Sequence, residues 1–467
     1  MKVENGKASG IRIAYIGGGS RAWAWTFMTD LAVEPSMSGE IALYDIDRPA
    51  AEKNKIIGER ITADPRAVGK WDYRVADSLQ NALTGADFVI ISILPGTFEE
   101  MEHDVHMPER LGIWQSVGDT AGPGGMIRAL RTIPMFTEIA NAIKAYAPEA
   151  IVINYTNPMT LCMQELYRAY PDIKAFGCCH EVFSTQKLLA AAAEEMLGME
   201  NVSRDEVHVN VLGINHFTWF DEASCRGVDL MPVYRAFVDK HYEEGYEDPE
   251  KPWTASPFNC AHRVKFDLFR RYGLIAAAGD RHLAEFMPGD EYLKDPQTAA
   301  SWKFRLTPVS HRKEDLKNRL ARSARLVSGE EAIDLKPSGE EGIRLMRALC
   351  GLDCVVSNVN LPNYGQIGNL PRGVVVETNA VFSKGSILPV LAGDLPWKLQ
   401  TLILEHLQSQ KFIMDATRDG CKEDVVRAFK LDPNVAAHKL SEEDVRKLVD
   451  DMIAATKAYL PEGWYDR

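Results

Sequence analysis

The chain has 467 residues, of which 46% are hydrophobic, so it is long enough and apolar enough to bury a large core. It carries 53 Lys and Arg against 66 Asp and Glu, and the net charge of −13 disfavours nucleic acid or an anionic membrane as the main partner. We find no bilayer-length apolar run and no signal-peptide core, and the eight cysteines form no CxxC pair. We therefore expect a cytoplasmic protein with reduced thiols.

The first half of the chain alternates short apolar runs with helical patterns. Rows of Ile and Val, typical of strands covered on both faces, occur at 11–16, 41–44, 88–93 and 151–153. An amphipathic helical pattern at 133–146 is the clearest of those between them. The alternation predicts βαβ units and a Rossmann-type, doubly wound parallel sheet.

The second half has a mixed pattern that predicts an α+β domain. Strands are expected at 207–213, 357–361 and 374–378, followed by amphipathic helices at about 397–417 and 441–458. We place the boundary at residue 195, which gives domains 1–195 and 196–467. Because no low-complexity linker separates them, we expect the two halves to share one core.

A glycine-rich turn follows the first predicted strand. Gly17, Gly19 and Ser20 begin a G-x-G-x-x-A motif, in which glycine lets the backbone approach a pyrophosphate at the start of a helix. Asp45 ends the second strand, where a carboxylate accepts hydrogen bonds from both ribose hydroxyls and favours NAD over NADP. Gly96 would lie in a third loop, on the nicotinamide side. A tight strand-to-helix turn is the alternative reading, but the full set favours NAD binding by domain 1–195.

Polar residues follow three later strands. The segments are Asn154-Tyr155-Thr156-Asn157-Pro158, Cys178-Cys179-His180-Glu181 and Gly213-Ile214-Asn215-His216. Ligands of open α/β sheets gather at the carboxyl ends of strands, so these segments are expected to converge beside the cofactor. Thiolate and imidazole suit a divalent metal, although each residue alone also fits an ordinary structural role.

These motifs together resemble glycoside hydrolase family 4, whose fold is like that of lactate and malate dehydrogenases. The matching residues, in chain order, are the glycine turn, Gly-Asp-Thr-Ala-Gly-Pro-Gly-Gly at 118–125, Arg-Ala-Leu-Arg-Thr-Ile-Pro at 128–134, and the three polar segments. The resemblance implies NAD and Mn²⁺ as cofactors and a homodimer or homotetramer. Domain 196–467 would then serve substrate binding, metal binding and oligomerisation.

The resemblance also implies roles for individual residues. Cys179 and His216 would bind the metal, and we choose Cys179 over Cys178 because it directly precedes His180. Asn154 and Asn157 would hold sugar hydroxyls. Asp119 would lie near the leaving group, as general acid or contact. For the base that removes the C2 proton, the segment 261–273 offers Asp267, with Tyr272 as the alternative.

The chemistry implied by the resemblance differs from that of most glycosidases, which use two carboxylates. In the family mechanism NAD⁺ oxidises C3 of the sugar, a base removes the acidified C2 proton, and the metal stabilises the enediolate. The aglycone is then eliminated, water adds, and the ketone is reduced again. NAD therefore acts without net consumption.

Substrate choice depends on Cys-His-Glu-Val at 179–182, which resembles the α-galacturonidase branch of the family. His180 would contact an unphosphorylated sugar, and Glu181 must face away from a substrate carboxylate or pair with a cation. Arg263 is expected to bind that carboxylate, with Lys265 and Arg281 as alternatives, because guanidinium binds carboxylate through two hydrogen bonds. The alternatives are an α-galactosidase, α-glucosidase or α-glucuronidase of the same family, or a lactate/malate-type dehydrogenase.

Overall fold

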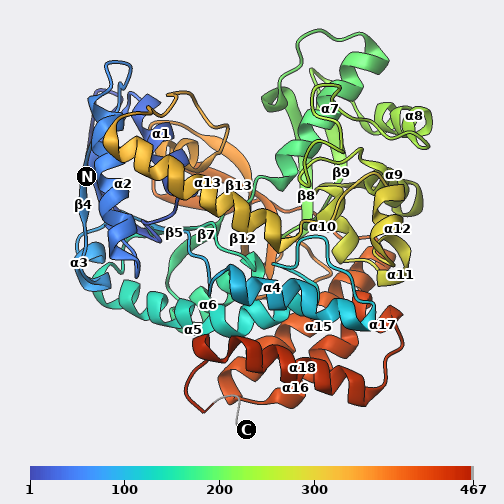
Figure 1. The fold of residues 1–467 in the computed structure, drawn as a ribbon. Coiled ribbons are helices and arrows are strands. Elements are labelled where there is room, and N and C mark those ends of the chain that lie inside the picture. Colours follow the sequence, from blue (N-terminus) through green and yellow to red (C-terminus); the bar gives the residue numbers. More distant parts are fainter. Residues whose placement is uncertain (464–467) are drawn as a thin grey trace.

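A computed structural model describes residues 1–463 and contains two sheets with helices packed around them (Figure 1). The larger sheet has ten strands, and its order is β14-β13-β12-β7-β6-β5-β2-β3-β4, with β1 paired to β2. Their bounds are β1 Lys2–Glu4, β2 Lys7–Ile16, β3 Met37–Tyr44, β4 Lys70–Val75, β5 Phe88–Ile91, β6 Ile151–Asn154, β7 Lys174–Gly177, β12 Val355–Pro362, β13 Val375–Ser383 and β14 Ser386–Pro389.

The six strands from β4 to β7 are parallel, in the order β4-β3-β2-β5-β6-β7. The strand order reverses between β2 and β5, which is the switch point where doubly wound sheets bind their ligands. The predicted fold class, a Rossmann-type sheet fused to an α+β region, is confirmed.

Helices cover both faces of this sheet, so its strands are buried on both sides. Ile13 and Tyr15 of β2 point to one face, whereas Ala14 and Ile16 point to the other. The first face packs on α1 (Trp23–Val33), α2 (Arg48–Ala63) and α14 (Gly342–Leu349). The second packs on α3 (Leu79–Leu83), α5 (Gly122–Tyr146) and α6 (Met159–Ala169). This burial on both faces explains why the strands have continuous apolar runs such as 11–16 in the sequence.

Strands from the C-terminal half extend the sheet beyond β7. Asn360 of β12 pairs with Gly177 of β7, and β12, β13 and β14 continue as an antiparallel meander. Residues 1–195 therefore contribute seven of the strands but do not complete the sheet. The hydrophobic core also crosses residue 195, because Leu345 and Val359 are buried with Ile13 and Tyr15. The division into 1–195 and 196–467 stays a prediction.

The second sheet stands against the edge of the first through β13. It contains β8 (Val207–Ile214), β9 (Phe217–Cys225), β10 (Val228–Asp229) and β11 (Ile275–Ala276). The Asn379 side chain on β13 donates to the Val209 carbonyl on β8 at 2.7 Å. The helices of this part are α7 Glu181–Leu197, α8 Met231–His241, α9 Arg263–Tyr272, α10 Asp280–Glu285, α11 Gly289–Tyr292 and α12 Pro296–Ser301.

The remaining helices close the molecule around α5. The C-terminal helices, red in Figure 1, pack their apolar sides on it; they are α15 Trp397–Asp419, α16 Lys422–Leu431, α17 Pro433–Ala437 and α18 Glu442–Thr456. Helix α4 (Phe98–His106) packs against α5, and helix α13 (Val309–Ser328) packs against α4 and α2 (Figure 1). Three short 3-10 turns complete the secondary structure at Met107–Leu111, Arg204–Glu206 and Lys457–Tyr459. Within residues 1–463, no helix has both the length and the apolarity needed to cross a bilayer.

Candidate functional site

The glycine turn lies at the switch point, directly after β2. A Cβ atom on Gly17, whose φ is +92°, would stand 2.0 Å from the Ser92 carbonyl oxygen, so only glycine fits there. A Cβ on Gly19 would stand 2.8 Å from a carboxylate oxygen of Asp45. Helix α1 begins at Trp23 with no side chain capping it, so its first amides and its dipole remain available to an anion. The turn therefore fits a pyrophosphate.

Asp45 lies at the end of β3 and contacts that turn. Its carboxylate accepts hydrogen bonds from the Gly19 and Asp47 amides, both at 2.8 Å. Burial raises its pKa despite these bonds. Ser20 follows the turn, and its carbonyl accepts from the Asn54 side chain at 2.8 Å. The predicted NAD residues from the first two strand ends thus lie together, which suits the adenosine half of a dinucleotide.

Gly96 lies in the loop after β5, across the switch point from β2. Its φ is +85°, and the preceding Pro95 carbonyl accepts from Arg131 Nε at 2.8 Å. Arg131 also forms a buried ion pair with Asp104. The loop is therefore held rigidly where the third cofactor contact is expected.

Three ligand-type side chains converge beyond this loop, in the region between the two sheets. Asp119 precedes α5, His216 lies in the turn between β8 and β9, and His282 lies on α10. One ligand atom from each lies within 4.8 Å of the other two. Two imidazoles and a carboxylate are a donor set that first-row divalent metals accept. Sequence analysis predicted Asp119 and His216 but missed His282.

The hydrogen bonds of His216 define its tautomer. Thr120 Oγ1 donates its single proton to Asp119 Oδ1 at 2.8 Å and lies 3.0 Å from His216 Nδ1. With the hydroxyl proton on the ionised carboxylate, the threonine oxygen accepts from His216, so this arrangement favours the tautomer with the proton on Nδ1 and the lone pair on Nε2. Burial and the nearby charge of His282 lower the pKa of His216 to about 3, which keeps the imidazole neutral and ready to bind a metal.

Glu181 orients the second imidazole. Its carboxylate accepts from the Gly279 amide at 2.8 Å and lies 3.4 Å from His282 Nε2. His282 Nδ1 is buried with no hydrogen-bond partner among residues 1–463, so it offers a second free donor atom. Burial opposes ionisation of Glu181, but His282 outweighs it and the pKa of Glu181 is well below its usual value. A carboxylate behind a histidine is the common outer partner of a metal ligand.

Asp119 is half-buried and carries a negative charge. Burial alone would raise its pKa, but the positive charges of Arg128 and the two histidines hold the pKa well below the usual range. Ionised Asp119 suits metal binding or stabilisation of positive charge better than it suits proton donation. Its role beside the leaving group stays a prediction.

Cys179 lies beside this group but outside the set that converges within 4.8 Å. Burial and the nearby Glu377 raise the pKa of its thiol well above 9, against a hydrogen bond from Asn215, the neighbour of His216. Burial also raises the pKa of Cys178, whose side chain lies by Tyr155. Both thiols are therefore protonated at neutral pH unless a bound cation lowers their pKa.

The two predicted sugar-binding asparagines differ in their contacts. Asn154 is buried at the end of β6, where its amide bonds the Thr156 backbone on both sides, at 3.1 and 2.9 Å. Asn157 has a buried side-chain oxygen without a partner among residues 1–463, and its carbonyl accepts from Arg128 Nε at 3.1 Å. Asn157 therefore offers a free polar group, whereas Asn154 shapes the loop.

The structure does not bring Asp267 and Tyr272 to the converging group. The Asp267 carboxylate, on α9, accepts from the Tyr242 hydroxyl at 2.7 Å and from the Tyr292 hydroxyl at 2.5 Å. Tyr272 packs its ring on Trp219, and burial raises its pKa. The first turn of α9 touches α10 through its backbone, because Asp280 accepts from the Val264 and Lys265 amides at 3.1 and 3.2 Å.

Two further predicted residues also make other contacts. Arg263 donates from Nε to the Tyr242 carbonyl at 3.2 Å and from Nη1 to the Ser301 carbonyl at 2.7 Å, so its guanidinium is already engaged. His180 is exposed and lies 3.2 Å from Glu340, with its ring near Trp23 of α1. The hydrogen bond with Glu340 raises the pKa of His180 and desolvation lowers it, and the hydrogen bond outweighs desolvation.

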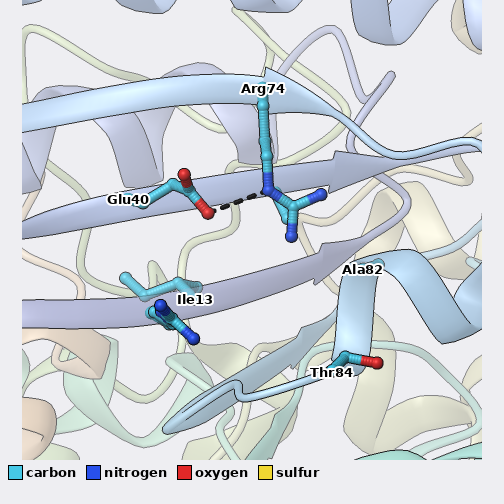
Figure 2. Close-up of a pocket in the computed structure, with 7 residues that line it drawn as sticks. Ile13, Glu40, Arg74, Ala82 and Thr84 are labelled. Atoms are coloured by element: carbon cyan, nitrogen blue, oxygen red, sulfur yellow. Dashed lines mark hydrogen bonds and ion pairs between the residues drawn. The ribbon is translucent and has the colours of Figure 1, made fainter.

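A separate cavity of about 220 Å³ lies on the larger sheet, away from these residues (Figure 2). Arg74 donates to Glu40 at 2.8 Å across it, as Figure 2 shows, and the lining comes from β2, β3, β4 and the end of α3. Arg12 is the third charged residue of the lining, and none of the predicted site residues lines the cavity.

Comparison with known proteins finds two family models that match this chain. The model of the "Family 4 glycosyl hydrolase" family matches residues 12–195, and that of the "Family 4 glycosyl hydrolase C-terminal domain" matches residues 211–435. An alpha-galacturonidase of Lachnoclostridium phytofermentans is 61% identical over 465 residues, which cover 99% of this chain and 100% of the relative.

Two solved structures have the same fold. A Bacillus subtilis protein, 50% identical, superposes with a TM-score of 0.91 over 95% of this chain and 100% of its own. A 6-phospho-alpha-glucosidase from gut microorganisms, solved in complex with NAD and Mn²⁺, is 19% identical and has a TM-score of 0.78 over 97% of this chain and 99% of its own.

Proposed function

Because this chain belongs to the family 4 glycosyl hydrolases, we propose that it hydrolyses α-galacturonides with NAD and Mn²⁺ as cofactors. The observation that carries the proposal is the full-length similarity, at 61% identity, to an alpha-galacturonidase. The polar residues that converge beyond the glycine turn support it, because the reaction needs a dinucleotide and a metal near one sugar.

The first strand ends would hold NAD. The glycine turn after β2 and the start of α1 would bind the pyrophosphate, and Asp45 would bind the adenosine ribose. Bound NAD supplies a hydride acceptor and returns the hydride at the end of the cycle. The chain itself orients the cofactor by rigid turns at Gly17 and Gly96, both of positive φ.

The second group would hold the metal. His216 Nε2 and the Cys179 thiolate are the proposed ligands, and His282 and Asp119 lie close enough to share the ion or its water. A divalent cation held there would supply positive charge to stabilise the negative charge that develops on the sugar. Thr120 keeps His216 in the required tautomer, and Glu181 keeps His282 in place.

The remaining roles concern the sugar and its protons. We propose that Asn157 binds a sugar hydroxyl through its unpaired oxygen and that Asp119 lies by the leaving group. For Asp267 to act as the base, its carboxylate must first release the Tyr242 or Tyr292 hydroxyl. A homodimer or homotetramer is proposed from the resemblance to the family, and light scattering would test it.

The test is release of p-nitrophenol from the α-galacturonide, α-galactoside and α-glucoside, with NAD⁺ and Mn²⁺ added or omitted. We expect cleavage of the galacturonide alone, dependent on both additions, with no net NADH. Cleavage of a neutral glycoside instead would replace the substrate and retain the chemistry. Stoichiometric NADH from a hydroxy acid, without glycoside cleavage, would contradict the proposal in favour of a dehydrogenase.

A further inference from the structure

Two arginines reach the candidate site without an acidic partner. Arg281 directly precedes His282 on α10, and Arg312 lies in the first turn of α13. Both side chains are half-buried. No carboxylate of residues 1–463 forms an ion pair with either guanidinium within 4.0 Å. Because half-buried guanidinium groups are costly to leave unpaired, this arrangement needs an explanation.

Arg312 gives the clearest evidence of an unpaired guanidinium. Its Nε is buried and makes no hydrogen bond within the described chain. Burial lowers the pKa of Arg312, and the ionised Asp119 is the first of the charges that oppose this effect. Asp119 nevertheless lies beyond ion-pair distance. A buried donor left unsatisfied costs about 1–3 kcal/mol, more when it is charged, so such a donor in a folded protein calls for a partner outside the chain, such as a ligand, an ion or water.

The contacts of Arg281 position its side chain but occupy only part of its guanidinium. Its Nη1 donates weakly to Thr307 Oγ1, at 3.3 Å, and its guanidinium carbon lies 4.8 Å from the centre of the Phe258 ring. Its backbone carbonyl accepts from the Ser116 hydroxyl, which fixes the start of α10. The rest of the guanidinium fork is free to bind. Thr307 stands two residues before α13, so it joins the two elements that carry the arginines.

Other arginines of this region are already engaged. Arg131 is saturated by Asp104 and the Pro95 carbonyl. Arg128 donates to the Asn157 carbonyl, and Arg263 donates to two backbone carbonyls. The charge of Arg128 acts chiefly on Asp119. Arg128, like Arg281, makes one side-chain hydrogen bond and no ion pair among residues 1–463, but its charge is opposed chiefly by Asp119, so Arg281 and Arg312 carry the remaining positive charge of the site.

We propose that Arg281 and Arg312 together bind the carboxylate on C6 of a uronide, which makes them the residues that select an acidic sugar. The proposal rests on the function proposed above and names its specificity determinant. Guanidinium suits the task because its planar fork matches a carboxylate with two hydrogen bonds. Glu181 does not repel that carboxylate, because its charge is turned to His282 and the Gly279 amide.

The experiment compares p-nitrophenyl α-galacturonide with its methyl ester, which removes the negative charge and adds one methyl group. The specificity constant kcat/KM is measured for both in the wild-type holoenzyme and in Arg281→Gln, Arg312→Gln and Arg312→Lys. Arg325→Gln serves as the control, since it removes a charge from the same helix, where Arg325 pairs with Glu331. Thermal unfolding with NAD⁺ verifies that each variant is folded.

We expect the acid-to-ester ratio of kcat/KM to fall about 10- to 100-fold in each glutamine variant, mainly through KM, because hydrogen bonds to charged groups are worth this much. Arg312→Lys should recover part of the ratio, and Arg325→Gln should leave it unchanged. An unchanged ratio in both folded glutamine variants would overturn the clamp while leaving the proposed function intact. Failure of the wild-type enzyme to cleave the galacturonide would overturn the proposed function itself.

The same assay distinguishes two sources of negative charge on C6. A 6-phospho-α-galactoside carries a phosphate where the uronide carries a carboxylate, and guanidinium binds both. If the wild type cleaves the phosphorylated sugar with the higher kcat/KM, and the glutamine variants lose that activity, the clamp is a phosphate site and the uronide proposal is overturned.

Discussion

Within residues 1–463, two groups of side chains have the composition of a metal site. They differ in which of their ligand atoms remain without a hydrogen-bond partner. One group is Asp119, His216 and His282, and the other is Cys260, His262 and Asp280. In the second group, Asp280 accepts from the amides that begin α9, at 3.1 and 3.2 Å, and Cys260 Sγ lies 3.8 Å from His262 Nδ1. The Asp280 carboxylate therefore serves the backbone, and the Cys260 thiol and His262 Nδ1 serve each other.

The first group is different because its free atoms point to a missing ligand. His282 Nδ1 has no partner in the described part of the chain, and the hydrogen bonds of Thr120 favour a lone pair on His216 Nε2. In the second group, burial raises the pKa of Cys260 to about 12, and the nearby Lys265 adds positive charge. Composition and proximity alone thus do not identify a metal site, whereas unused donor atoms do.

The largest effect is expected from His216→Asn. Asparagine tolerates the left-handed backbone of this residue, where φ is +65°, so the variant removes the ligand without straining the turn. We expect kcat/KM to fall about 1,000-fold or more, since the metal contributes several kcal/mol of charge stabilisation. His262→Asn is the matched control, because its φ is +59°. Equal losses of activity in both folded variants would erase the contrast between the two groups.

The pH dependence of Mn²⁺ affinity tests Cys179. Its thiol has a pKa well above 9, so a metal that binds the thiolate must displace one proton. The affinity should then rise about tenfold per pH unit between pH 6 and pH 8. His216, with a pKa of about 3, is already neutral in this range and adds no slope. Calorimetry in two buffers should give about one proton released per ion, and none in Cys179→Ser. A flat wild-type profile would exclude the thiolate ligand.

A smaller effect is expected from Glu181→Gln. The amide keeps the size of the side chain but loses the charge that faces His282. Outer partners of metal ligands are worth about 10- to 100-fold in metal affinity, and we expect a loss of this size in the dissociation constant for Mn²⁺. Glu340→Gln is the control, since Glu340 pairs with the exposed His180. An unaltered constant in Glu181→Gln would mean that His282 stays outside the metal shell.

The smallest effect is expected from Cys260→Ala in the second group. The change removes a half-buried thiol whose contact is His262, so it should cost about 1 kcal/mol in the free energy of unfolding. The affinity for Mn²⁺ should stay within about threefold of the wild type. Urea unfolding and metal titration measure the two quantities. A large loss of metal affinity would show that the second group also binds a cation.

Much of the fold could be predicted from local sequence patterns. The strands at 11–16, 41–44, 88–93 and 151–153 were predicted correctly in type and place, because two-sided burial selects unbroken apolar runs. Strand β4 was missed, since this edge strand alternates exposed and buried residues over Lys70–Val75. Helix α13 was missed because most of its surface is polar and few of its side chains are buried.

The candidate site was predicted only in part. His216 was found because Asn-His directly follows a clear strand, whereas the strand before His282 has only two residues, Ile275–Ala276. The polar residues 280–282, which follow this short strand, were the pattern from which His282 could have been predicted. Asp267 was predicted from the family resemblance and Arg263 from the affinity of guanidinium for carboxylate. Neither argument includes side-chain direction on α9, where Asp267 accepts from Tyr242 and Arg263 donates to the Ser301 carbonyl.

The sequence by itself determined the dinucleotide turn, the parallel sheet and the family, because close backbone approach and two-sided burial each demand particular residues at fixed spacing. Tertiary structure alone decided three other features. It paired β12 with β7 across the chain, set His282 against His216 and Glu181, and left Arg281 and Arg312 without acidic partners. Each depends on contacts between segments far apart in the chain, and local residue patterns carry no record of which atoms such contacts leave unpaired.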